Sequence, residues 1–247
     1  MNSSGSTPRI LAVQNSPTSG LGRLGDWLAF AGLKVELMAG SSMPATLEGY
    51  HGVVFLGGGY MPDDDHSLPW LPQERELAGQ ALRHRIPLLG ICLGQQLLAH
   101  VGGGEVTASS GQTERGSVAI KLLPAAAEDP LFSPQEDQEL RMIQNHKDSV
   151  TALPPEAVLL ASSPACPIQA FRLGDCAWGL QFHPEVGPER LRTWDEASLA
   201  KQGVDKEALA RAAEADGPQN LRQAKLLAQT FAAIVTDCAQ GGKETHE

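Results

Sequence analysis

The chain has 247 residues, of which 42% are hydrophobic and 19% are charged, and its formal net charge at pH 7 is −10. This length and composition suffice for one large domain with a substantial core. The acidic balance argues against nonspecific binding to nucleic acid or to anionic membranes. The longest apolar stretches are strand-length and fall short of the roughly twenty residues that a membrane span requires.

The N-terminus and the cysteines indicate the compartment. Residues 1–8 are polar and predict a flexible arm without the pattern of a signal peptide. The four cysteines, Cys92, Cys166, Cys176 and Cys238, have no metal-ligand spacing. We therefore expect a cytoplasmic protein with reduced thiols and with no metal or cofactor.

Strands and helices alternate in the N-terminal part of the chain. Apolar segments predict strands at 9–14, 33–38, 51–56 and 86–91, and amphipathic segments predict helices at 21–31 and 72–85. This alternation predicts a parallel sheet that helices cover on both faces. In such sheets a ligand binds beyond the carboxyl ends of the strands.

The third predicted strand ends in a glycine triplet at 57–59, and the acidic stretch Asp-Asp-Asp-His follows at 63–66. Glycines let a backbone face a substrate without a Cβ in the way. The alternative for the triplet is a tight strand-to-loop turn. Consecutive acidic residues point in different directions, so the acidic stretch predicts a solvated loop rather than a metal site.

The fourth predicted strand meets a helical pattern through Gly-Ile-Cys-Leu-Gly at 90–94. Small residues on both sides of Cys92 suit a sharp, crowded turn. A thiol at a helix N-terminus is favoured as the thiolate, which is the reactive nucleophile. The alternative is that Cys92 is simply a small buried hydrophobic residue.

After the glycine run at 102–104 the pattern changes to short strands separated by turns. We expect strands at 118–123, 139–143, 157–162, 168–172 and 177–182. Their hairpin-like spacing favours antiparallel pairing in an extension of the same sheet. Within this part, Glu114-Arg115-Gly116 stands out, but its residues alone assign it no mechanism.

The last predicted strand runs directly into His183-Pro184-Glu185. Proline biases the residue before it away from helix, so we expect His183 to be extended. The nearby Glu185 carboxylate can accept the second imidazole N–H and stabilise the imidazolium. A lone histidine after a strand is typical of a surface residue. Together with Cys92, however, this pair indicates a nucleophile, a base and an orienting acid.

Beyond residue 186 the chain becomes helical and charged. The segment 224–235 predicts a strong amphipathic helix, and the Ala-, Glu- and Lys-rich stretch 193–218 predicts a mobile helical hairpin. We expect the helices of 187–240 to pack on the same domain. The tail at 241–247 predicts disorder.

These motifs together resemble the class I (triad) glutamine amidotransferases, over residues 9–186. The segment 90–96 is similar to the family's nucleophile elbow, and 183–185 to its His-Pro-Glu. The glycine triplet resembles its Gly-Gly-Pro loop, with Gly59 in place of the proline. The segments 57–70 and 145–150 are similar to free-standing GMP-synthase-like members. The resemblance implies a flavodoxin-like, three-layer α/β/α fold with a mostly parallel sheet plus an antiparallel extension.

The resemblance also implies a role for each matching residue. Cys92 would be the nucleophile, His183 the base and Glu185 the orienting acid. The backbone N–H groups of Gly58 and Leu93 would form the oxyanion hole. The residues that the resemblance assigns to substrate binding are Gly59, Gln96, His146 and Asp148. A capping or packing role stays open for Gln96, and a supporting or surface role for His146.

The implied reaction is hydrolysis of glutamine, or another γ-glutamyl amide, through a Cys92 thioester. A separate synthase partner would accept the ammonia, since the residues after 186 are too few for a synthase domain. A stand-alone γ-glutamyl peptide or amide hydrolase with the same triad stays open, because only the leaving-group pocket would differ. A non-catalytic regulatory or binding module is disfavoured by the complete triad.

Overall fold

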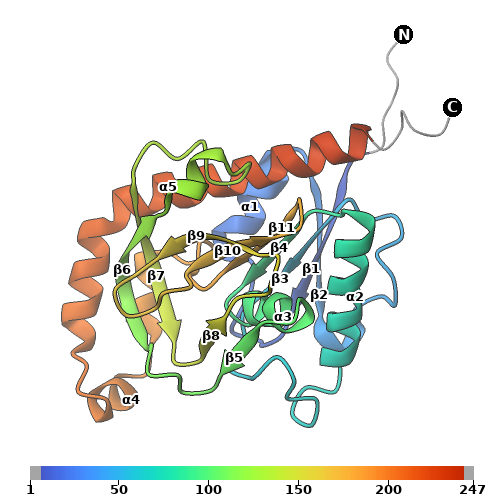
Figure 1. Cartoon of the computed structure of the whole chain (residues 1–247). Coiled ribbons are helices and arrows are strands. Elements are labelled where there is room, and N and C mark those ends of the chain that lie inside the picture. Colours follow the sequence, from blue (N-terminus) through green and yellow to red (C-terminus); the bar gives the residue numbers. More distant parts are fainter. Residues whose placement is uncertain (1–6, 242–247) are drawn as a thin grey trace, which may run out of the picture.

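The computed structural model describes residues 7–241 and has one nine-stranded sheet between two helical layers (Figure 1). The strands lie in the order β2-β1-β3-β4-β11-β10-β9-β6-β7. A small separate ladder of β5 (Glu105–Thr107) and β8 (Ser149–Ala152) was not predicted from the sequence. The predicted arm at 1–8 and tail at 241–247 lie outside the described residues, except for residues 7, 8 and 241.

The parallel part of the sheet has five strands, and the alternating sequence pattern predicted all of them except β11. Its strands are β2 (Lys34–Ala39), β1 (Arg9–Gln14), β3 (Gly52–Phe55), β4 (Leu88–Ile91) and β11 (Ala177–Leu180). Every residue of β3, β4 and β11 is buried, because helices cover both faces of these strands. Their carboxyl ends lead into the glycine triplet, Cys92 and His183.

The antiparallel part confirms the expected extension, with one correction. Its strands are β10 (Ala170–Leu173), β9 (Val158–Ser162), β6 (Glu114–Leu122) and β7 (Glu139–His146). The segment 177–182 was expected to pair antiparallel, but β11 pairs parallel with β4 and antiparallel with β10. Because both of its edges are paired and its residues are buried, β11 joins the two parts of the sheet.

The antiparallel part curls back toward the end of β11. Although β7 is the last strand in the sheet order, Ile143 on β7 forms an isolated antiparallel bridge with His183. The His183 N–H donates to the Ile143 carbonyl at 3.0 Å. The curl therefore brings the residues that follow Ile143 close to the carboxyl ends of β4 and β11.

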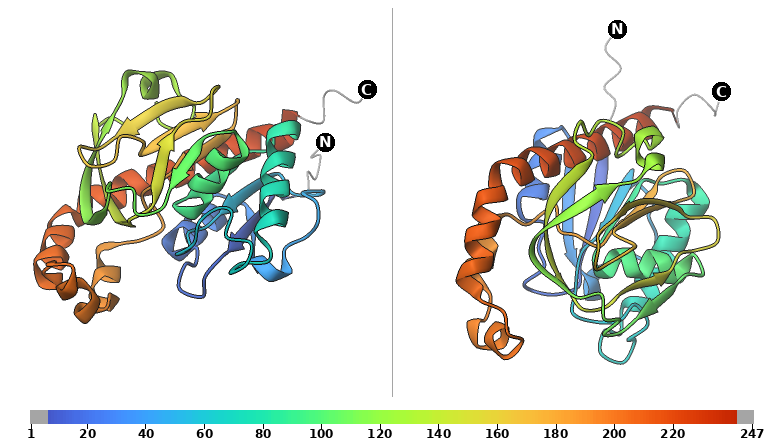
Figure 2. Two further views of the ribbon diagram at one scale, coloured as in Figure 1. Left: turned by 60° about the horizontal axis from the view of Figure 1, so that its bottom comes forward. Right: turned by 60° about the vertical axis from the view of Figure 1, so that its left-hand side comes forward.

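Helices cover both faces of the sheet, which gives the three-layer α/β/α fold (Figures 1 and 2). On one face, α1 (Gly22–Phe30) and α5 (Lys206–Gly241) share a hydrophobic core. On the other face, α2 (Leu71–His84) and α3 (Leu93–Val101) share a second core. Trp178 of β11 packs edge-on against Phe231 of α5, with ring centroids 6.4 Å apart.

The C-terminal helices differ from the predicted hairpin at 193–218. A 3₁₀ helix at Pro188–Thr193 leads into the short α4 (Glu196–Lys201), and α5 then runs unbroken for 36 residues. Pro218 lies inside α5, where a proline removes one helical hydrogen bond and costs roughly 3 kcal/mol. The expected separate helix at 224–235 is thus the second half of a longer one.

Contacts with β7 explain how α5 continues past its proline. Asn220 Nδ2 donates to the Arg141 carbonyl at 2.9 Å, and Gln223 Oε1 accepts from the Arg141 N–H at 2.8 Å. Both amides are buried, so they hold α5 to the sheet edge.

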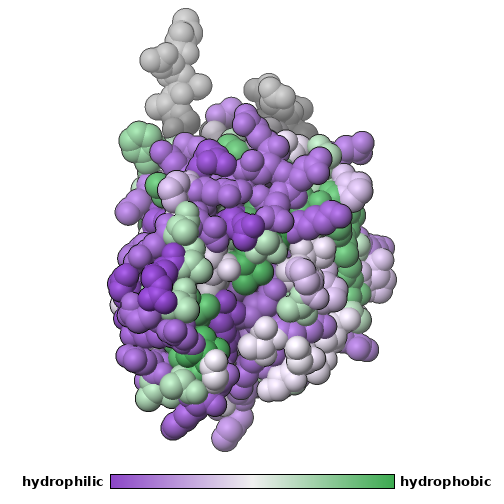
Figure 3. Space-filling view, turned by 90° about the vertical axis from the view of Figure 1, so that its left-hand side faces the viewer, coloured by the Kyte–Doolittle hydropathy of each residue, from purple (hydrophilic) through white to green (hydrophobic). Residues whose placement is uncertain are grey.

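The face of the molecule in Figure 3 is mostly hydrophilic, with scattered small hydrophobic areas. Within residues 7–241, no helix has the length and apolar character needed to cross a membrane.

Candidate active site

Cys92 occupies a strained backbone position between β4 and α3. Its φ of 55° and ψ of −105° belong to a region that non-glycine residues rarely adopt, at a cost of order 1–3 kcal/mol. The Cys92 N–H donates to the Leu180 carbonyl at 2.7 Å, and its carbonyl accepts from the Gln96 N–H at 3.0 Å. The thiol therefore stands at the first turn of α3, where the helix dipole favours an anion.

Close backbone packing requires the two glycines that flank Cys92. A Cβ on Gly90 would overlap the backbone of Gly94, and a Cβ on Gly94 would overlap the carbonyl of Phe55 on β3. A larger residue at either position would displace β3 or α3. The crowded turn expected at 90–94 is therefore present.

His183 and Glu185 form a short, largely buried pair. His183 Nδ1 lies 2.7 Å from Glu185 Oε1, and Glu185 Oε2 is buried without a hydrogen-bond partner within residues 7–241. Burial disfavours charge on the ring, but the Glu185 carboxylate and the Cys92 sulfur outweigh it. Together they raise the pKa of His183 well above its ordinary value. This geometry favours the protonated, imidazolium form of His183.

The glycine triplet lies directly against these groups. A Cβ built on Gly57 would lie 3.3 Å from His183 Cε1 and 3.5 Å from Cys92 Cβ. A Cβ on Gly58 would lie 2.8 Å from Leu93 Cδ2, so the loop packs on the elbow. Within residues 7–241, neither the Gly58 N–H nor the Leu93 N–H donates to a protein acceptor. Free N–H groups beside a nucleophile are the donors that an oxyanion requires.

Arg23 on α1 fixes the backbone of the His-Pro-Glu segment. Its main-chain N–H donates to the Glu185 carbonyl at 3.3 Å, and its Nε donates to the Pro184 carbonyl at 3.0 Å. Its Nη2 donates to Asn220 Oδ1 on α5 at 2.7 Å. Gly22 has a φ of +46°, and a Cβ there would overlap the Glu185 carbonyl. Sequence reasoning missed Arg23, because one arginine in a helical pattern forms no motif.

A cavity of about 160 Å³ opens beside Cys92. The residues around it include all those that the resemblance assigned to the substrate, namely Gly59, Gln96, His146 and Asp148. Gly59 has open space where a Cβ would be. Gln96 Nε2 donates to the Asp148 carbonyl at 3.0 Å and to Gln181 Oε1 at 3.3 Å, so it ties α3 to the loop after β7.

Comparison with known proteins assigns the family. The model of the class-I glutamine amidotransferases matches residues 26–198. This chain belongs to that family. A subunit of glutamine-hydrolyzing GMP synthase from Methanopyrus kandleri is 30% identical over 67% of this chain and 86% of its own length. The protein of the same name from Pyrococcus furiosus is 33% identical, over 55% of this chain and 66% of its own length.

Solved structures agree with this assignment. A glutamine amidotransferase from Thermotoga maritima is 29% identical, with a TM-score of 0.80, and the match covers 93% of this chain and 99% of that one. One from Methylobacillus flagellatus is 27% identical, with a TM-score of 0.76, over 94% of this chain and 95% of the other. The class I amidotransferase fold expected from the sequence is thus confirmed.

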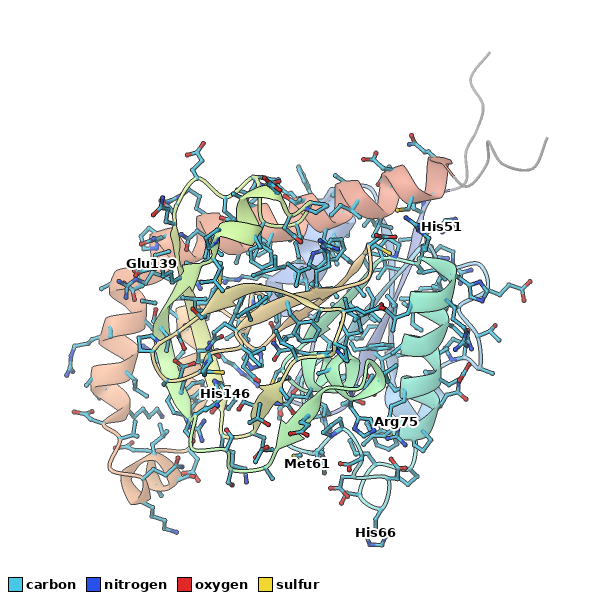
Figure 4. All side chains as sticks on the ribbon, viewed as in Figure 1. His51, Met61, His66, Arg75, Glu139 and His146 are labelled. Atoms are coloured by element: carbon cyan, nitrogen blue, oxygen red, sulfur yellow. The ribbon has the colours of Figure 1, made fainter. Side chains whose placement is uncertain are left out.

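His146 lies inside this amidotransferase rather than on an open surface (Figure 4). Its ring is buried, and Nε2 lies 3.2 Å from Glu114 Oε2. Glu114 Oε1 accepts from Ser163 Oγ at 2.6 Å, and Oε2 also accepts from Gln169 Nε2. The ring therefore faces Glu114 through Nε2, while its Nδ1 is buried without a hydrogen-bond partner within residues 7–241. Substrate binding by His146 stays a prediction.

Arg115 is a cavity residue whose role the sequence did not predict. It lies on β6 between the buried Glu114 and Gly116, and it borders the cavity beside Cys92. Its Nη1 donates to the His146 carbonyl at 2.8 Å, and its Nη2 donates to Gln202 Oε1 at 3.4 Å. Burial lowers the pKa of Arg115, while the nearby Cys92 sulfur opposes that shift. The Glu-Arg-Gly tripeptide was the available signal, and of its three residues only Arg115 borders the cavity.

A buried acid lies behind the glycine triplet. Asn15 Nδ2 donates to Glu74 Oε1 at 3.0 Å and to the Leu56 carbonyl at 3.3 Å, and a Cβ on Gly58 would lie 3.3 Å from Asn15 Cβ. Burial raises the pKa of Glu74 to about 8, although the bond from Asn15 opposes the shift. Neither residue belongs to a sequence motif, so both were missed.

The acidic stretch at 63–66 is a loop that Arg75 holds in place. Arg75 Nη1 and Nη2 donate to the two carboxylate oxygens of Asp65 at 2.7 and 2.8 Å. His66 lies at the tip of this loop, pointing away from the rest of the molecule (Figure 4). In the described part of the chain, this stretch does not gather three metal-type donors. A solvated loop, as expected, fits these contacts.

Elsewhere, ligand atoms of Glu114, His146 and Cys166 lie within 4.8 Å of one another. Burial raises the pKa of the Cys166 thiol to about 12, and the thiol donates to the Ile168 carbonyl. Both Glu114 oxygens already accept hydrogen bonds. This cluster therefore has the chemistry of a hydrogen-bonded core rather than of a metal site.

Proposed function

We propose that this amidotransferase hydrolyses the γ-amide of glutamine through a Cys92 thioester and supplies the ammonia to a separate synthase protein. The observation that carries the proposal is that the His183–Glu185 pair and the glycine triplet lie against Cys92, which borders a small cavity together with Gly58. The names of the GMP synthase relatives support a synthase partner. The match spans 66% of the length of the Pyrococcus protein, so the ammonia acceptor is itself part of the proposal.

In the first half of the reaction the thiolate attacks the amide. Cys92 Sγ bonds to the γ-carbonyl carbon, and the resulting oxyanion accepts hydrogen bonds from the N–H groups of Gly58 and Leu93. Protonated His183 then donates its proton to the amide nitrogen. The C–N bond breaks, ammonia leaves, and a γ-glutamyl thioester remains on Cys92.

In the second half water releases the acyl group. Neutral His183 takes a proton from a water molecule, whose oxygen attacks the thioester carbon. The C–S bond breaks, glutamate departs, and the thiolate and the imidazolium are restored. Glu185 holds the His183 ring in one orientation and stabilises its charge in both halves. Gly59, Gln96 and Asp148 border the cavity where the rest of the substrate would lie.

A second candidate function is supported by a larger hollow next to His183. It measures about 280 Å³ and is bordered by His183, Glu185, Trp194 and the loop at 18–20. His183 protonates the leaving group, so this side would receive it. The space favours an amine larger than ammonia, as in a stand-alone γ-glutamyl peptide or amide hydrolase with the same triad.

We also propose the working unit and its setting. Residues 9–186 form the amidotransferase domain, and the helices of 187–240 serve as an added layer on it; packing of α5 on α1 and β7 supports this. The four cysteines are free, which supports a reducing, cytoplasmic setting.

The test is turnover by the purified protein on glutamine beside a panel of γ-glutamyl amides and peptides. We expect ammonia release from glutamine that Cys92→Ala abolishes and that the control Cys238→Ala leaves unchanged. Weak glutamine turnover that rises on adding the ATP-dependent part of a GMP synthase would support the partner. Strong peptide cleavage with negligible glutaminase activity would favour the second candidate. Turnover retained by Cys92→Ala would contradict both.

A further inference from the structure

Arg115 is a cation in the cavity without an acidic partner. Within residues 7–241, its guanidinium forms no ion pair, and its hydrogen bonds go to the Glu114 carbonyl, the His146 carbonyl and Gln202 Oε1. These neutral oxygens orient the side chain but leave its charge unbalanced. A partly buried arginine without a counter-ion favours a bound anion, and its planar fork suits a carboxylate.

The acids that border the same space are already engaged. Asp148 Oδ1 accepts from the Ser109 N–H at 2.7 Å. Asp195, which borders the adjoining hollow of about 200 Å³ with Arg115, caps α4 by accepting from the Ala197 N–H at 3.0 Å. Neither pairs with Arg115. Lys147 also borders the cavity, so two cationic side chains and one carboxylate, that of Asp148, surround this space.

The position of Arg115 indicates which end of the substrate it meets. Arg115 borders the cavity with Cys92, Gln96 and Asp148, whereas His183 borders a different hollow, which shares Asn145 with that cavity but does not include Arg115. The leaving group departs toward His183, so the Arg115 side receives the part of the substrate that stays on Cys92 as the thioester. In a γ-glutamyl group, that part ends in an α-carboxylate and an α-ammonium.

We propose that Arg115 is a specificity residue that pairs with the α-carboxylate of the γ-glutamyl substrate. The second carboxylate oxygen of Asp148, Oδ2, accepts no hydrogen bond within residues 7–241 and is available to the α-ammonium. The inference rests on the proposed function, because it assumes a γ-glutamyl ligand in this cavity. It applies equally to glutamine and to γ-glutamyl peptides, which share that carboxylate. Gln202, in the turn between α4 and α5, holds Arg115 in place.

The structure also explains why the arginine acts on binding rather than on chemistry. Its hydrogen bonds go to the β6 and β7 backbone and to Gln202, and none goes to His183 or Glu185. Loss of one charge-assisted pair lowers affinity by about 10- to 100-fold. We therefore expect Arg115→Gln to raise KM for glutamine by about that factor and to change kcat by less than about threefold. Arg115→Lys keeps the charge and should restore part of the affinity.

A binding measurement separates this inference from catalysis. Calorimetry on Cys92→Ala, with and without Arg115→Gln, uses L-glutamine and L-glutamine α-amide, in which a neutral amide replaces the α-carboxylate. We expect Arg115→Gln to weaken glutamine binding about 10- to 100-fold and binding of the α-amide less than about threefold. Arg141→Gln, on neighbouring β7 outside the cavity, is the matched control and should change neither.

Other results would overturn the inference. Equal losses for the two ligands, unchanged glutamine affinity, or no glutamine binding by the Arg115-containing protein at millimolar concentration would each do so. If glutamine binds in an Arg115-dependent way but the Cys92-containing protein does not hydrolyse it, the inference is supported and the proposed function is contradicted.

Discussion

The parallel and antiparallel parts of the sheet contribute different things to the site. The parallel strands β3, β4 and β11 end at the glycine triplet, Cys92 and His183, which are the groups proposed for bond making and breaking. The antiparallel strands β6 and β7 bring Arg115 and the segment 145–148, which border the cavity proposed for the substrate. The groups proposed for chemistry and those proposed for recognition therefore come from two differently built parts of the sheet.

The two halves are also stabilised differently. The turn at Cys92 depends on close backbone packing. There is no room for a side chain at position 90 or 94, because the backbones of Gly94 and of β3 lie too close. The recognition side depends on a buried polar network centred on Glu114, with His146, Ser163 and Gln169. Changes in the parallel part should therefore affect turnover, and changes in the antiparallel part should affect affinity and stability.

The largest effect is expected from His183→Asn in the parallel part. Loss of the general acid and base should lower kcat by about 10³-fold for every γ-glutamyl substrate, with a much smaller change in KM. Steady-state ammonia release measures both constants. His100→Asn, an exposed histidine at the end of α3, is the control. A loss confined to KM would contradict the division between the two parts.

A smaller effect is expected from Glu114→Gln in the antiparallel part. The new amide would oppose the Gln169 amide, which donates to Glu114 now, and leave buried polar groups unpaired. We expect unfolding free energy to fall by about 1–3 kcal/mol in urea denaturation. Glutamine KM should rise while kcat stays within about threefold. Glu139 is exposed on β7, so the control Glu139→Gln should leave stability unchanged. If Glu114→Gln lowered kcat as much as His183→Asn does, the division between the two parts of the sheet would be refuted.

The smallest effect concerns Glu74 and depends on pH. Burial raises the pKa of Glu74 from 4.5 to about 8, so the folded protein keeps a proton that the unfolded chain releases. The contribution of this proton to the free energy of unfolding is complete below pH 4.5, and it is lost as the pH rises to about 8. Between about pH 5.5 and 8, the Tm of the wild type should therefore fall more than that of Glu74→Gln. Glu76 is exposed on the same helix, so the Tm of the control Glu76→Gln should fall with pH as that of the wild type does. An equal fall of Tm in the wild type, Glu74→Gln and Glu76→Gln would contradict this prediction.

The sequence predicted the parallel part well because local patterns specify it. Continuous apolar strands, the glycines around Cys92 and the proline after His183 each act through neighbouring residues. The parallel pairing of β11 could not be predicted, because its partner β4 lies far away in the sequence and no local pattern indicates that the two strands are neighbours. Likewise, the interior position of the His146 ring depends on Glu114, which lies on another strand.

Long-range contacts also account for the missed residues. Arg23 reaches a carbonyl of a segment far along the chain, and Asn15 reaches Glu74, so neither belongs to a local motif. The hairpin expected at 193–218 ends at Pro218, yet α5 continues through it, and buried amides on α5 bind the β7 backbone just beyond that proline. Sequence patterns therefore predicted the groups proposed for chemistry, whereas tertiary contacts determine what holds them and what recognises the substrate.

The central claim is that Cys92 carries the γ-glutamyl group. Peptide mass spectrometry, after acid quenching during glutamine turnover and after treatment with a diazoketone analogue of glutamine, tests it directly. We predict that both the acyl group and the analogue are found on Cys92. Burial raises the pKa of Cys166 to about 12 and of Cys176 to about 11, so these thiols should stay unmodified. Modification of another cysteine in preference to Cys92, or turnover without any modification of Cys92, would contradict the account.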